Sequence, residues 1–307
     1  MRHSRIDILA ASATLLLCGQ LGSRAQVYSD WSVRDTTVVT SMEEGTVKET
    51  DYAAQGIFMD WGTTLSEFDN YDGDTALDET PASVPASTAA VTLRGLQLNL
   101  PSLVDENGID LYLLTTEGIH IYMALDSPVY HQDPDRDVIK WIRYYAYEKR
   151  EHTRRLFRRY ERWEPLIRKY FAARGVPPEL AEICLIESGC TYEALSSAGA
   201  LGMWQIMPET GRRFGLVVNE LRDDRKDPVL STKAAAEILL SNYKRVGEWT
   251  LAAAAYNCGS GRILGQMKGG RNHWEAVRPG LPKETRQYIP SLLAIHYVWT
   301  YRDRLAL

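Results

Sequence analysis

Cysteine is scarce in this chain, which has 4 Cys among 307 residues. None of them stands with histidine at the short spacings of a structural zinc site, so no metal is expected, and no motif indicates another cofactor. The count is also too low for a small scaffold held together by disulfides. Whether Cys190 and Cys258 form a disulfide stays open, because the distance between two Cα atoms cannot be obtained from sequence.

Long hydrophobic runs are also lacking, whereas a membrane-spanning helix needs about 20 apolar residues. The main candidate, residues 8–17, follows basic residues and precedes small ones. This pattern predicts an export signal over residues 1–25, and therefore a periplasmic protein that is either free or associated with the cell envelope. An uncleaved anchor and a lipoprotein lipidated at Cys18 are alternatives, the second disfavoured by the large Leu17 just before the cysteine.

Basic residues are nearly absent from the first part of the exported chain. Residues 26–130 contain 3 Lys/Arg against 18 Asp/Glu, whereas residues 131–307 contain 29 Lys/Arg against 21 Asp/Glu. Low hydrophobicity with negative charge predicts a flexible, acidic, low-complexity arm over residues 26–95. Residues 96–134 contain short apolar runs, which indicate either a hairpin or a segment packed on the next domain.

From residue 135 onward the apolar residues recur at helical spacing. The expected helices cover residues 135–163, 166–175, 178–188, 208–214, 231–246, 249–256 and 284–301. Pro165 is expected to break the chain between the first two and Pro290 to kink the last, while Ser231 is expected to cap its helix. No convincing strand follows residue 131, so residues 135–307 are predicted to form an all-α domain. The basic run between residues 149 and 159 is interpreted as a solvated helix face, and no nucleic acid is expected as a partner.

Glu187 occupies an unusual position on the helix expected over residues 178–188. Leu180, Ile183 and Cys184 form an apolar stripe, and Glu187 takes the i+7 place on that stripe. Burial penalises the ionised form of a carboxyl group, so the pKa of Glu187 is predicted to be raised and the residue to act as a general acid. A structural ion pair with a nearby arginine is the alternative.

Three further blocks share the order and spacing of a known family. They are the Gly-rich run Ser196–Gln205, the block Ala254–Asn257 and the block Glu284–Tyr288. Together with Glu187 they resemble the lytic transglycosylases of the lysozyme superfamily, which cleave bacterial peptidoglycan. Trp204, and Pro282 two residues before Glu284, resemble the membrane-bound type D subgroup. The resemblance extends from about residue 135 to residue 301.

The resemblance implies a lysozyme-like multi-helix catalytic domain, preceded here by the flexible acidic segment. It implies that Glu187 is the single catalytic acid/base and that peptidoglycan glycan strands are the substrate. Cell-wall assembly proteins are further possible partners, and the oligomeric state stays open. The residues that match substrate-binding positions of the family are Ser196, Met203, Gln205, Tyr256, Asn257 and Tyr288. Ser196 also has a purely structural explanation as a turn cap, and Tyr256 as a core residue.

A single carboxylate constrains the chemistry, because most glycosidases use two. The resemblance implies that the N-acetyl group of the sugar assists and that the product carries a 1,6-anhydro end. A goose-type lysozyme, which hydrolyses the bond, is one alternative and would need an acidic residue such as Asp223, Asp224 or Asp227 to activate water. A non-catalytic glycan-binding protein is another. The subgroup's wall-binding repeats are not recognised before Leu307, so affinity is expected from the cleft or from the N-terminal portion.

Overall fold

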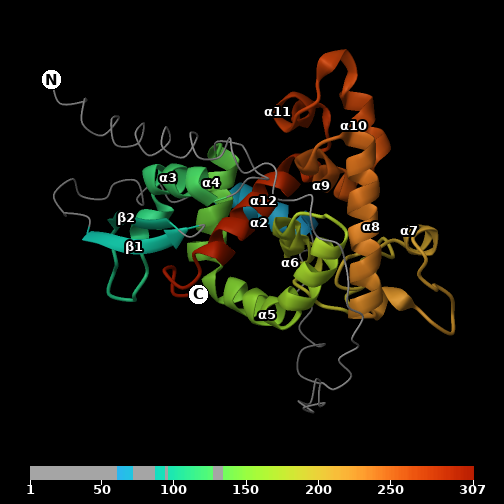
Figure 1. The fold of residues 1–307 in the computed structure, drawn as a ribbon, viewed down its shortest axis with the longest axis horizontal. Helices are drawn as coiled ribbons and strands as arrows, with labels where there is room; N and C mark the ends of the chain where they lie inside the picture. Colours follow the sequence, from blue (N-terminus) through green and yellow to red (C-terminus); the bar gives the residue numbers. More distant parts are fainter. Residues whose placement is uncertain (1–60, 72–86, 94–95, 127–133) are drawn as a thin grey trace, which may run out of the picture. The chain divides into compact units, whose positions relative to one another are not determined.

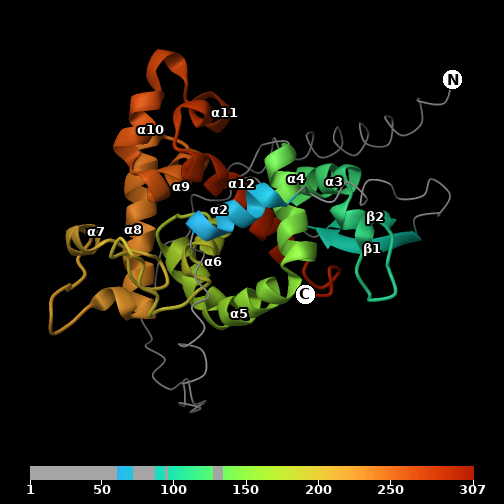
Figure 2. The ribbon, with the colours of Figure 1, turned by 180° about the vertical axis from the view of Figure 1, so that it is seen from behind.

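The computed structural model describes residues 61–71, 87–93, 96–126 and 134–307 (Figures 1 and 2). The predicted export signal and most of the predicted acidic arm lie outside these residues. None of the helices formed by these residues is both long and apolar enough to cross a bilayer.

Residues 134–307 are helical and contain isolated β-bridges but no strand, which confirms the all-α prediction. The α-helices are α4 (Arg136–Arg143), α5 (Arg150–Ala173), α6 (Ile183–Ser188), α7 (Pro208–Arg213), α8 (Pro228–Val246), α9 (Trp249–Cys258), α10 (Ser260–Gln266), α11 (Trp274–Val277) and α12 (Lys283–Thr300). Shorter turns join them: a π-helical turn η4 (Tyr144–Glu148) and the 3-10 turns η5 (Pro178–Glu182), η6 (Asp224–Lys226), η7 (Lys268–Gly270) and η8 (Arg278–Gly280).

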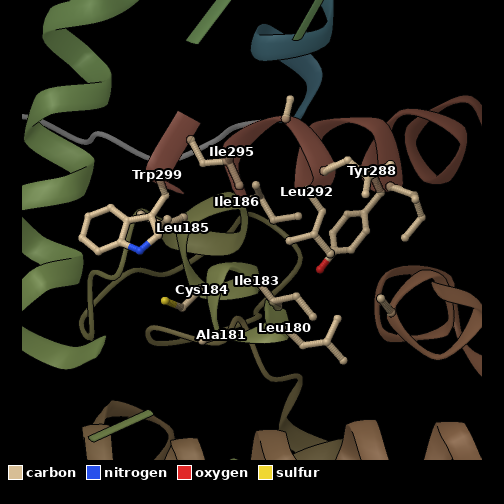
Figure 3. Packing of buried hydrophobic residues seen from close by; sticks show 14 of the residues in the cluster. Leu180, Ala181, Ile183, Cys184, Leu185, Ile186, Tyr288, Leu292, Ile295 and Trp299 are labelled. Atoms are coloured by element: carbon tan, nitrogen blue, oxygen red, sulfur yellow. The ribbon is translucent and has the colours of Figure 1, made fainter. Parts of the chain in front are cut away.

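Helix α12 is the centre of the domain's core. It contacts α4, α6 and α9, and Figure 1 shows it beside α4. Every residue from Tyr288 to Trp299 is buried, so this part of the helix is surrounded by neighbours on all sides. Helix α6 packs on α12, and Figure 3 shows Ile186 of α6 beside Leu292 of α12. The residues of α6 are therefore fixed by the most buried element of the fold.

Two helix boundaries differ from the sequence-based expectation. Pro165 does not break the chain, because α5 runs through it from Arg150 to Ala173. Proline removes one backbone hydrogen bond, and the buried residues on both sides of this exposed position, Leu156 and Ile167 among them, keep the helix continuous. Helix α8 begins earlier than expected, with Asp227 as its cap: its carboxylate accepts hydrogen bonds from two backbone N–H groups, each at 2.8 Å.

The helix expected over residues 178–188 changes type half-way. Residues Pro178–Glu182 form the 3-10 turn η5, and the α-helical part α6 begins at Ile183. A 3-10 turn has three residues per turn, so the faces that its residues occupy differ from those of a continuous α-helix. One consequence is that Glu182, which an α-helical count places off the apolar stripe, is fully buried.

Residues 87–93 and 96–102 form two paired strands, and a 3-10 turn and an α-helix follow them. Strands β1 (Ser87–Leu93) and β2 (Leu96–Ser102) pair antiparallel, with Ser87 opposite Ser102. The 3-10 turn η3 (Leu111–Leu114) and helix α3 (Thr116–Asp126) follow. The hydroxyl of Tyr297 on α12 donates to the carbonyl oxygen of Leu113 at 2.9 Å. The segment 96–134, for which a hairpin and packing on the next domain were the two alternatives, thus shows both features in its described part: it contributes strand β2 and it contacts α12.

Helix α2 (Trp61–Asn70) lies within the range predicted as an acidic arm. The ring of Phe68 stacks on Trp141 of α4, with ring centroids 3.8 Å apart, and is 3% exposed. Asp69 forms an ion pair with Lys283, the first residue of α12. The composition of the surrounding sequence is acidic and polar, so it gave no indication that one aromatic side chain anchors a helix here.

Candidate active site

The end of helix α6 holds Glu187 by means of a sharp turn. Gly189 and Cys190 both adopt positive φ angles, of 58° each, directly after the helix. A Cβ atom on Gly189 would approach the Leu156 and Arg159 side chains to 2.6 and 2.7 Å, so glycine fits where a larger residue would not. Arg159 of α5 donates to the Gly189 carbonyl oxygen at 2.6 Å. The turn after Glu187 is therefore fixed from outside the helix.

Glu187 is half-buried, and its carboxyl group accepts a hydrogen bond from the Tyr288 hydroxyl at 2.7 Å. Burial raises the pKa of Glu187 from 4.5 to about 8, the Tyr288 hydrogen bond opposes this shift, and the negative charge of Glu284 adds to it. No cation of the described chain contributes to its electrostatics. The structure thus agrees with the expectation of a raised pKa and gives no support to a structural ion pair with arginine.

A second carboxylate, Glu284, stands at the start of α12. The side-chain amide of Asn257 donates to Glu284 at 2.8 Å, and the Thr285 hydroxyl donates to the Asn257 oxygen, also at 2.8 Å. Asn257 at the end of α9 is thereby tied to α12 through both ends of its amide. Sequence reasoning did not name Glu284 as a site residue, although its position four residues before Tyr288 places the two on one face of the helix.

Tyr256 connects the site to the Gly-rich loop. Its hydroxyl donates to the backbone carbonyl oxygen of Trp204 at 2.8 Å. Burial raises the pKa of Tyr256 well above its usual value, and the charge of Glu187 contributes, so the two side chains lie within electrostatic reach of each other. The indole of Trp204 donates in turn to the Thr232 hydroxyl of α8 at 2.9 Å. These bonds fix the loop against α8 and α9.

The Gly-rich loop depends on one glycine and two polar side chains. Gly202 has a φ of 84°, and a Cβ atom there would lie 2.0 Å from the Arg225 carbonyl oxygen. The amide of Gln205 donates to the carbonyl oxygens of Gly202 and of Ala194, which precedes the loop, each at 2.9 Å. The Ser196 hydroxyl accepts from the Ala200 N–H at 3.0 Å. Ser196 and Gln205 therefore hold the loop together in this structure, and their contact with substrate stays a prediction.

Met203 is fully buried, so its side chain lies in the core beneath the loop. Its backbone carbonyl oxygen accepts a hydrogen bond from the hydroxyl of Ser188, at 2.8 Å. Ser188 directly follows Glu187 and is itself fully buried. The loop is thereby connected to the residue next to Glu187, and a role for Met203 as the floor of the cleft stays a prediction.

Arg225 is a residue of this region that sequence reasoning missed. It is 6% exposed, and its guanidinium donates to the carbonyl oxygens of Gly199 and Ile206, each at 2.9 Å, while it pairs with Asp223 at 2.7 Å. The stretch 221–227 looks like a solvated loop by composition. Arg225 nevertheless holds the Gly-rich loop in place through these hydrogen bonds, and no local sequence pattern indicated this.

The predicted site residues thus fall into two groups. Tyr288 donates a hydrogen bond to Glu187, Tyr256 lies within electrostatic reach of Glu187, and Asn257 is connected to this group through Glu284. The other three residues, Ser196, Met203 and Gln205, belong to the loop that Tyr256 and Ser188 support. Across the described ranges, no cluster of three or more His, Cys, Asp or Glu residues could hold a metal ion.

A cavity of about 400 Å³ lies elsewhere, between the end of α5 and helix α8. None of the predicted site residues lines it. Its charged lining is already paired, because Glu237 forms an ion pair with Arg174 and the Lys233 ammonium lies over the Tyr170 ring at 5.0 Å. The half-buried carboxyl group with a raised pKa lies outside this cavity, at Glu187.

Comparison with known proteins identifies the class of this domain. Residues 165–275 match the family described as Transglycosylase SLT domain, which spans Glu187, the Gly-rich loop and Asn257. The chain therefore contains a transglycosylase SLT domain, and it is homologous to lytic transglycosylases. Tyr288 and Glu284 lie beyond the matched residues.

The relatives are also transglycosylases by name, with one exception. The chain is 39% identical over 126 residues to membrane-bound lytic murein transglycosylase D of Escherichia coli strain K12, an alignment that covers 40% of this chain and 28% of the relative. It is 33% identical over 140 residues to the peptidoglycan transglycosylase gp16 of Escherichia phage T7, covering 43% of this chain and 10% of the relative. A putative tributyltin chloride resistance protein of Alteromonas strain M-1 is 39% identical over 92 residues, covering 30% and 44%.

Among solved structures, the soluble lytic transglycosylase Slt70 of Escherichia coli matches 67% of this chain and 38% of its own, with 21% identity and a TM-score of 0.41. The lytic transglycosylase Slt of Pseudomonas aeruginosa matches 54% of this chain and 30% of its own, with 22% identity and a TM-score of 0.40. The chain spans little more than a quarter of the length of the first relative, so its activity as a whole protein is a proposal.

Proposed function

We propose that this protein is a lytic transglycosylase that cleaves the β-1,4 bond between N-acetylmuramic acid and N-acetylglucosamine in peptidoglycan. The names of the relatives support this activity and this substrate. The single observation that carries the proposal is the state of Glu187 within the matched domain: a half-buried carboxyl group with a pKa raised to about 8 and a hydrogen bond from buried Tyr288. Such a group is protonated at neutral pH and can donate that proton.

In the first step of the proposed mechanism, Glu187 protonates the glycosidic oxygen while the bond to the anomeric carbon of N-acetylmuramic acid breaks. The Tyr288 hydroxyl holds one carboxyl oxygen, which leaves the other to face the substrate. The positive charge that develops at the anomeric carbon is stabilised by the N-acetyl oxygen of the same sugar. A second protein carboxylate is then unnecessary as a nucleophile.

In the second step, Glu187 has become a carboxylate and accepts the proton of the C6 hydroxyl, whose oxygen attacks the anomeric carbon. The product is a 1,6-anhydro-N-acetylmuramic end, and Glu187 is again protonated. The attacking hydroxyl belongs to the same sugar, so the reaction gains the advantage of a nucleophile already in place. The raised pKa suits both steps, because the group must give up and regain a proton near neutral pH.

The remaining predicted residues position the sugars in this proposal. Asn257 and Tyr256 form one wall of the cleft, where the bonds from Asn257 to Glu284 and from Thr285 to Asn257 keep the amide in a fixed orientation. The Gly-rich loop with Ser196, Met203 and Gln205 forms the other side. The bond from Tyr256 to Trp204 keeps the two sides at a constant separation.

The decisive experiment is mass spectrometry of the muropeptides that the purified protein releases from sacculi. The wild type is expected to release products with 1,6-anhydro ends, and Glu187→Gln to release none. Products with reducing ends would show a hydrolase instead. If Glu187→Gln released as much as the wild type, another residue would carry the chemistry. If the wild type bound sacculi but released no muropeptides, the protein would be a non-catalytic glycan-binding protein.

Hydrolysis of the goose-type lysozyme kind is the second candidate, and one observation favours it: the Glu284 carboxylate lies close enough to raise the pKa of Glu187. The three aspartates considered from sequence are engaged otherwise. Asp223 pairs with Arg225, Asp224 pairs with Arg222, and Asp227 caps α8. If Glu284 activated water, Glu284→Gln would abolish activity; a transglycosylase would keep most of it.

We also propose that the protein is exported and acts at the cell envelope, since the substrate lies there. The sequence pattern of residues 1–25 supports export, and the name of one relative includes a membrane-bound location. N-terminal sequencing of the protein recovered from the periplasm tests this: a mature protein that begins at Gln26 is the expected result. Recovery of the unprocessed chain from the cytoplasm would contradict it.

A further inference from the structure

Two cysteines bracket the end of the catalytic helix. Cys184 lies in α6 three residues before Glu187, and Cys190 follows three residues after it. Both are buried, with exposures of 0% and 2%, and both are free thiols in this structure. The site described above uses neither of them.

The backbone brings these two residues together. The N–H of Cys190 donates to the carbonyl oxygen of Cys184 at 3.0 Å, across the turn formed by Gly189. The path from one Cα atom to the other runs through the N–Cα bond of Cys190, the hydrogen bond, and the C=O and C–Cα bonds of Cys184. The sum of these lengths limits the distance between the two Cα atoms to about 7 Å. Disulfides in proteins join Cα atoms about 4.4–6.8 Å apart. Burial and the neighbouring Cys190 thiol raise the pKa of Cys184 well above its usual value, which is consistent with two adjacent side chains.

Cys258 is placed differently. It is half-buried, and its sulfur contacts the Gly259 carbonyl oxygen at 3.9 Å while Thr285 provides a further side-chain hydrogen bond. Its environment therefore belongs to the end of α9 and the start of α12. Of the three cysteines in residues 134–307, Cys184 and Cys190 are the pair whose backbone and thiols are in contact.

We propose that Cys184 and Cys190 form a disulfide that closes the turn carrying Glu187. This inference rests on export of the protein to an oxidising compartment and is independent of the catalytic mechanism. The two thiols lose two protons and two electrons, and an oxidising disulfide, either a low-molecular-weight one or that of a thiol oxidase, is reduced to two thiols. The exchange proceeds through a mixed disulfide, so it takes place while the chain folds and the sulfur atoms are still accessible.

The bond would have a local purpose. Cys190 is a non-glycine residue with a φ of 58°. This conformation costs free energy and persists only where the surrounding structure holds it. A covalent link to Cys184 imposes it and removes alternative conformations of the unfolded chain. Glu187, Ser188 and Gly189 lie inside the closed ring, so the orientation of the acid relative to Tyr288 becomes less dependent on weak contacts.

The test is peptide mapping of the purified full chain without reduction. The protein is denatured in the presence of an alkylating agent and cleaved with trypsin and with a protease specific for glutamate, which cuts after Glu182, Glu187 and Glu193. The expected product is Ile183–Glu187 joined to Ser188–Glu193, lighter by two hydrogens than the two peptides together. Alkylated Cys184 and Cys190, or a link from either to Cys258, would overturn the proposal.

Thermal unfolding gives a second measurement. Protein refolded with a reductant is expected to melt about 5 °C below protein refolded with oxidised and reduced glutathione. The matched control Cys258→Ala should keep this difference, whereas the double variant Cys184→Ala/Cys190→Ala should lose it. A wild type that melts at the same temperature under both conditions, or a control that loses the difference, would contradict the disulfide. Neither measurement depends on activity, so failure here leaves the proposed function untouched.

Discussion

Two glutamates, five residues apart on the segment that forms η5 and α6, show opposite solutions to the burial of a carboxyl group. Glu182 at the end of η5 is fully buried and accepts hydrogen bonds from the Tyr160 hydroxyl at 3.1 Å and from Arg168 at 3.0 Å. His296 of α12 approaches its other oxygen to 3.6 Å. Glu187 near the end of α6 is half-buried, and its environment contains Tyr288 and a second carboxylate.

The difference between the two lies in the cation. Arg168 and its neighbours compensate the charge of Glu182, so that residue contributes to the structure only as part of a buried network. Glu187 has no such partner in the described chain, and its raised pKa is the consequence. Comparison of the two indicates that a buried carboxyl group with a cation is a structural element, whereas one without a cation is available for proton transfer. Four substitutions or conditions test this comparison.

The largest effect is expected for Glu187→Gln. Removal of a general acid typically costs a factor of about 10²–10⁴ in rate, so we expect release of muropeptides to fall about 10³-fold with the fold intact. Glu193→Gln, an exposed glutamate six residues further on, is the matched control and should retain activity. Turnover of sacculi together with circular dichroism measures both. An equal loss of activity in both variants would contradict the assignment of Glu187 as the general acid.

Glu182→Ala is expected to affect stability instead of chemistry. The substitution leaves a cavity and removes the acceptor of the buried Tyr160 hydroxyl, whereas Arg168 keeps its ion pair with Glu164. A buried donor left without an acceptor costs about 1–3 kcal/mol. The free energy of unfolding in urea measures this cost, with Glu161→Ala on the exposed side of α5 as control. Activity per folded molecule should change little. A folded, stable and inactive Glu182→Ala would make Glu182, too, part of the catalytic machinery.

The pH dependence of stability should carry the signature of Glu187. Its pKa is about 8 in the folded state, against the ordinary glutamate value of 4.5 that applies to the unfolded chain, so between these values the folded protein binds more protons than the unfolded chain. Stability contributed by this group is therefore present below pH 4.5 and lost as the pH rises toward 8, on the order of 2 kcal/mol for a half-buried group. Subtraction of the unfolding free energies of Glu187→Gln from those of the wild type isolates the effect. A difference that is constant between about pH 5 and pH 8 would contradict it.

The smallest effect is expected for Tyr288→Phe. The Tyr288 hydrogen bond favours the ionised form of Glu187, so its removal should raise the pKa further and move the alkaline decline of kcat/KM to higher pH. Loss of the positioning contact should lower kcat about tenfold. The pH–rate profile measures both, with Tyr297→Phe on the same helix as control, because that hydroxyl bonds the Leu113 carbonyl oxygen far from Glu187 in sequence. An alkaline limb that moves to lower pH would contradict the assigned direction.

Much of this chain follows from local pattern. The spacing of apolar residues predicted the helical character of residues 134–307, and positive-φ glycines end helices at Gly175 and Gly247 as expected. The placement of Glu187 beside an apolar stripe predicted its raised pKa. Helical character and the position of Glu187 on the stripe depend on neighbours within one or two turns of helix, and the sequence contains that information in full.

The burial and pairing of Glu182 could not be predicted in the same way. The α-helical count that located Glu187 does not hold in the 3-10 turn, and the partners of Glu182 lie 14 and 22 residues away on α5 and still further along the chain on α12. Glu284 next to Glu187 and the clamp of Arg225 on the Gly-rich loop depend on similarly distant contacts.

The sequence by itself determined which segments are helical and which carboxyl group stands on an apolar stripe, because both depend on the geometry of a single helix. Tertiary structure alone decided which glutamate receives an arginine and which receives a tyrosine and a second carboxylate. The physical reason is that the pKa of a buried group is set by the charges and dipoles that packing brings within a few ångströms, whatever their separation along the chain.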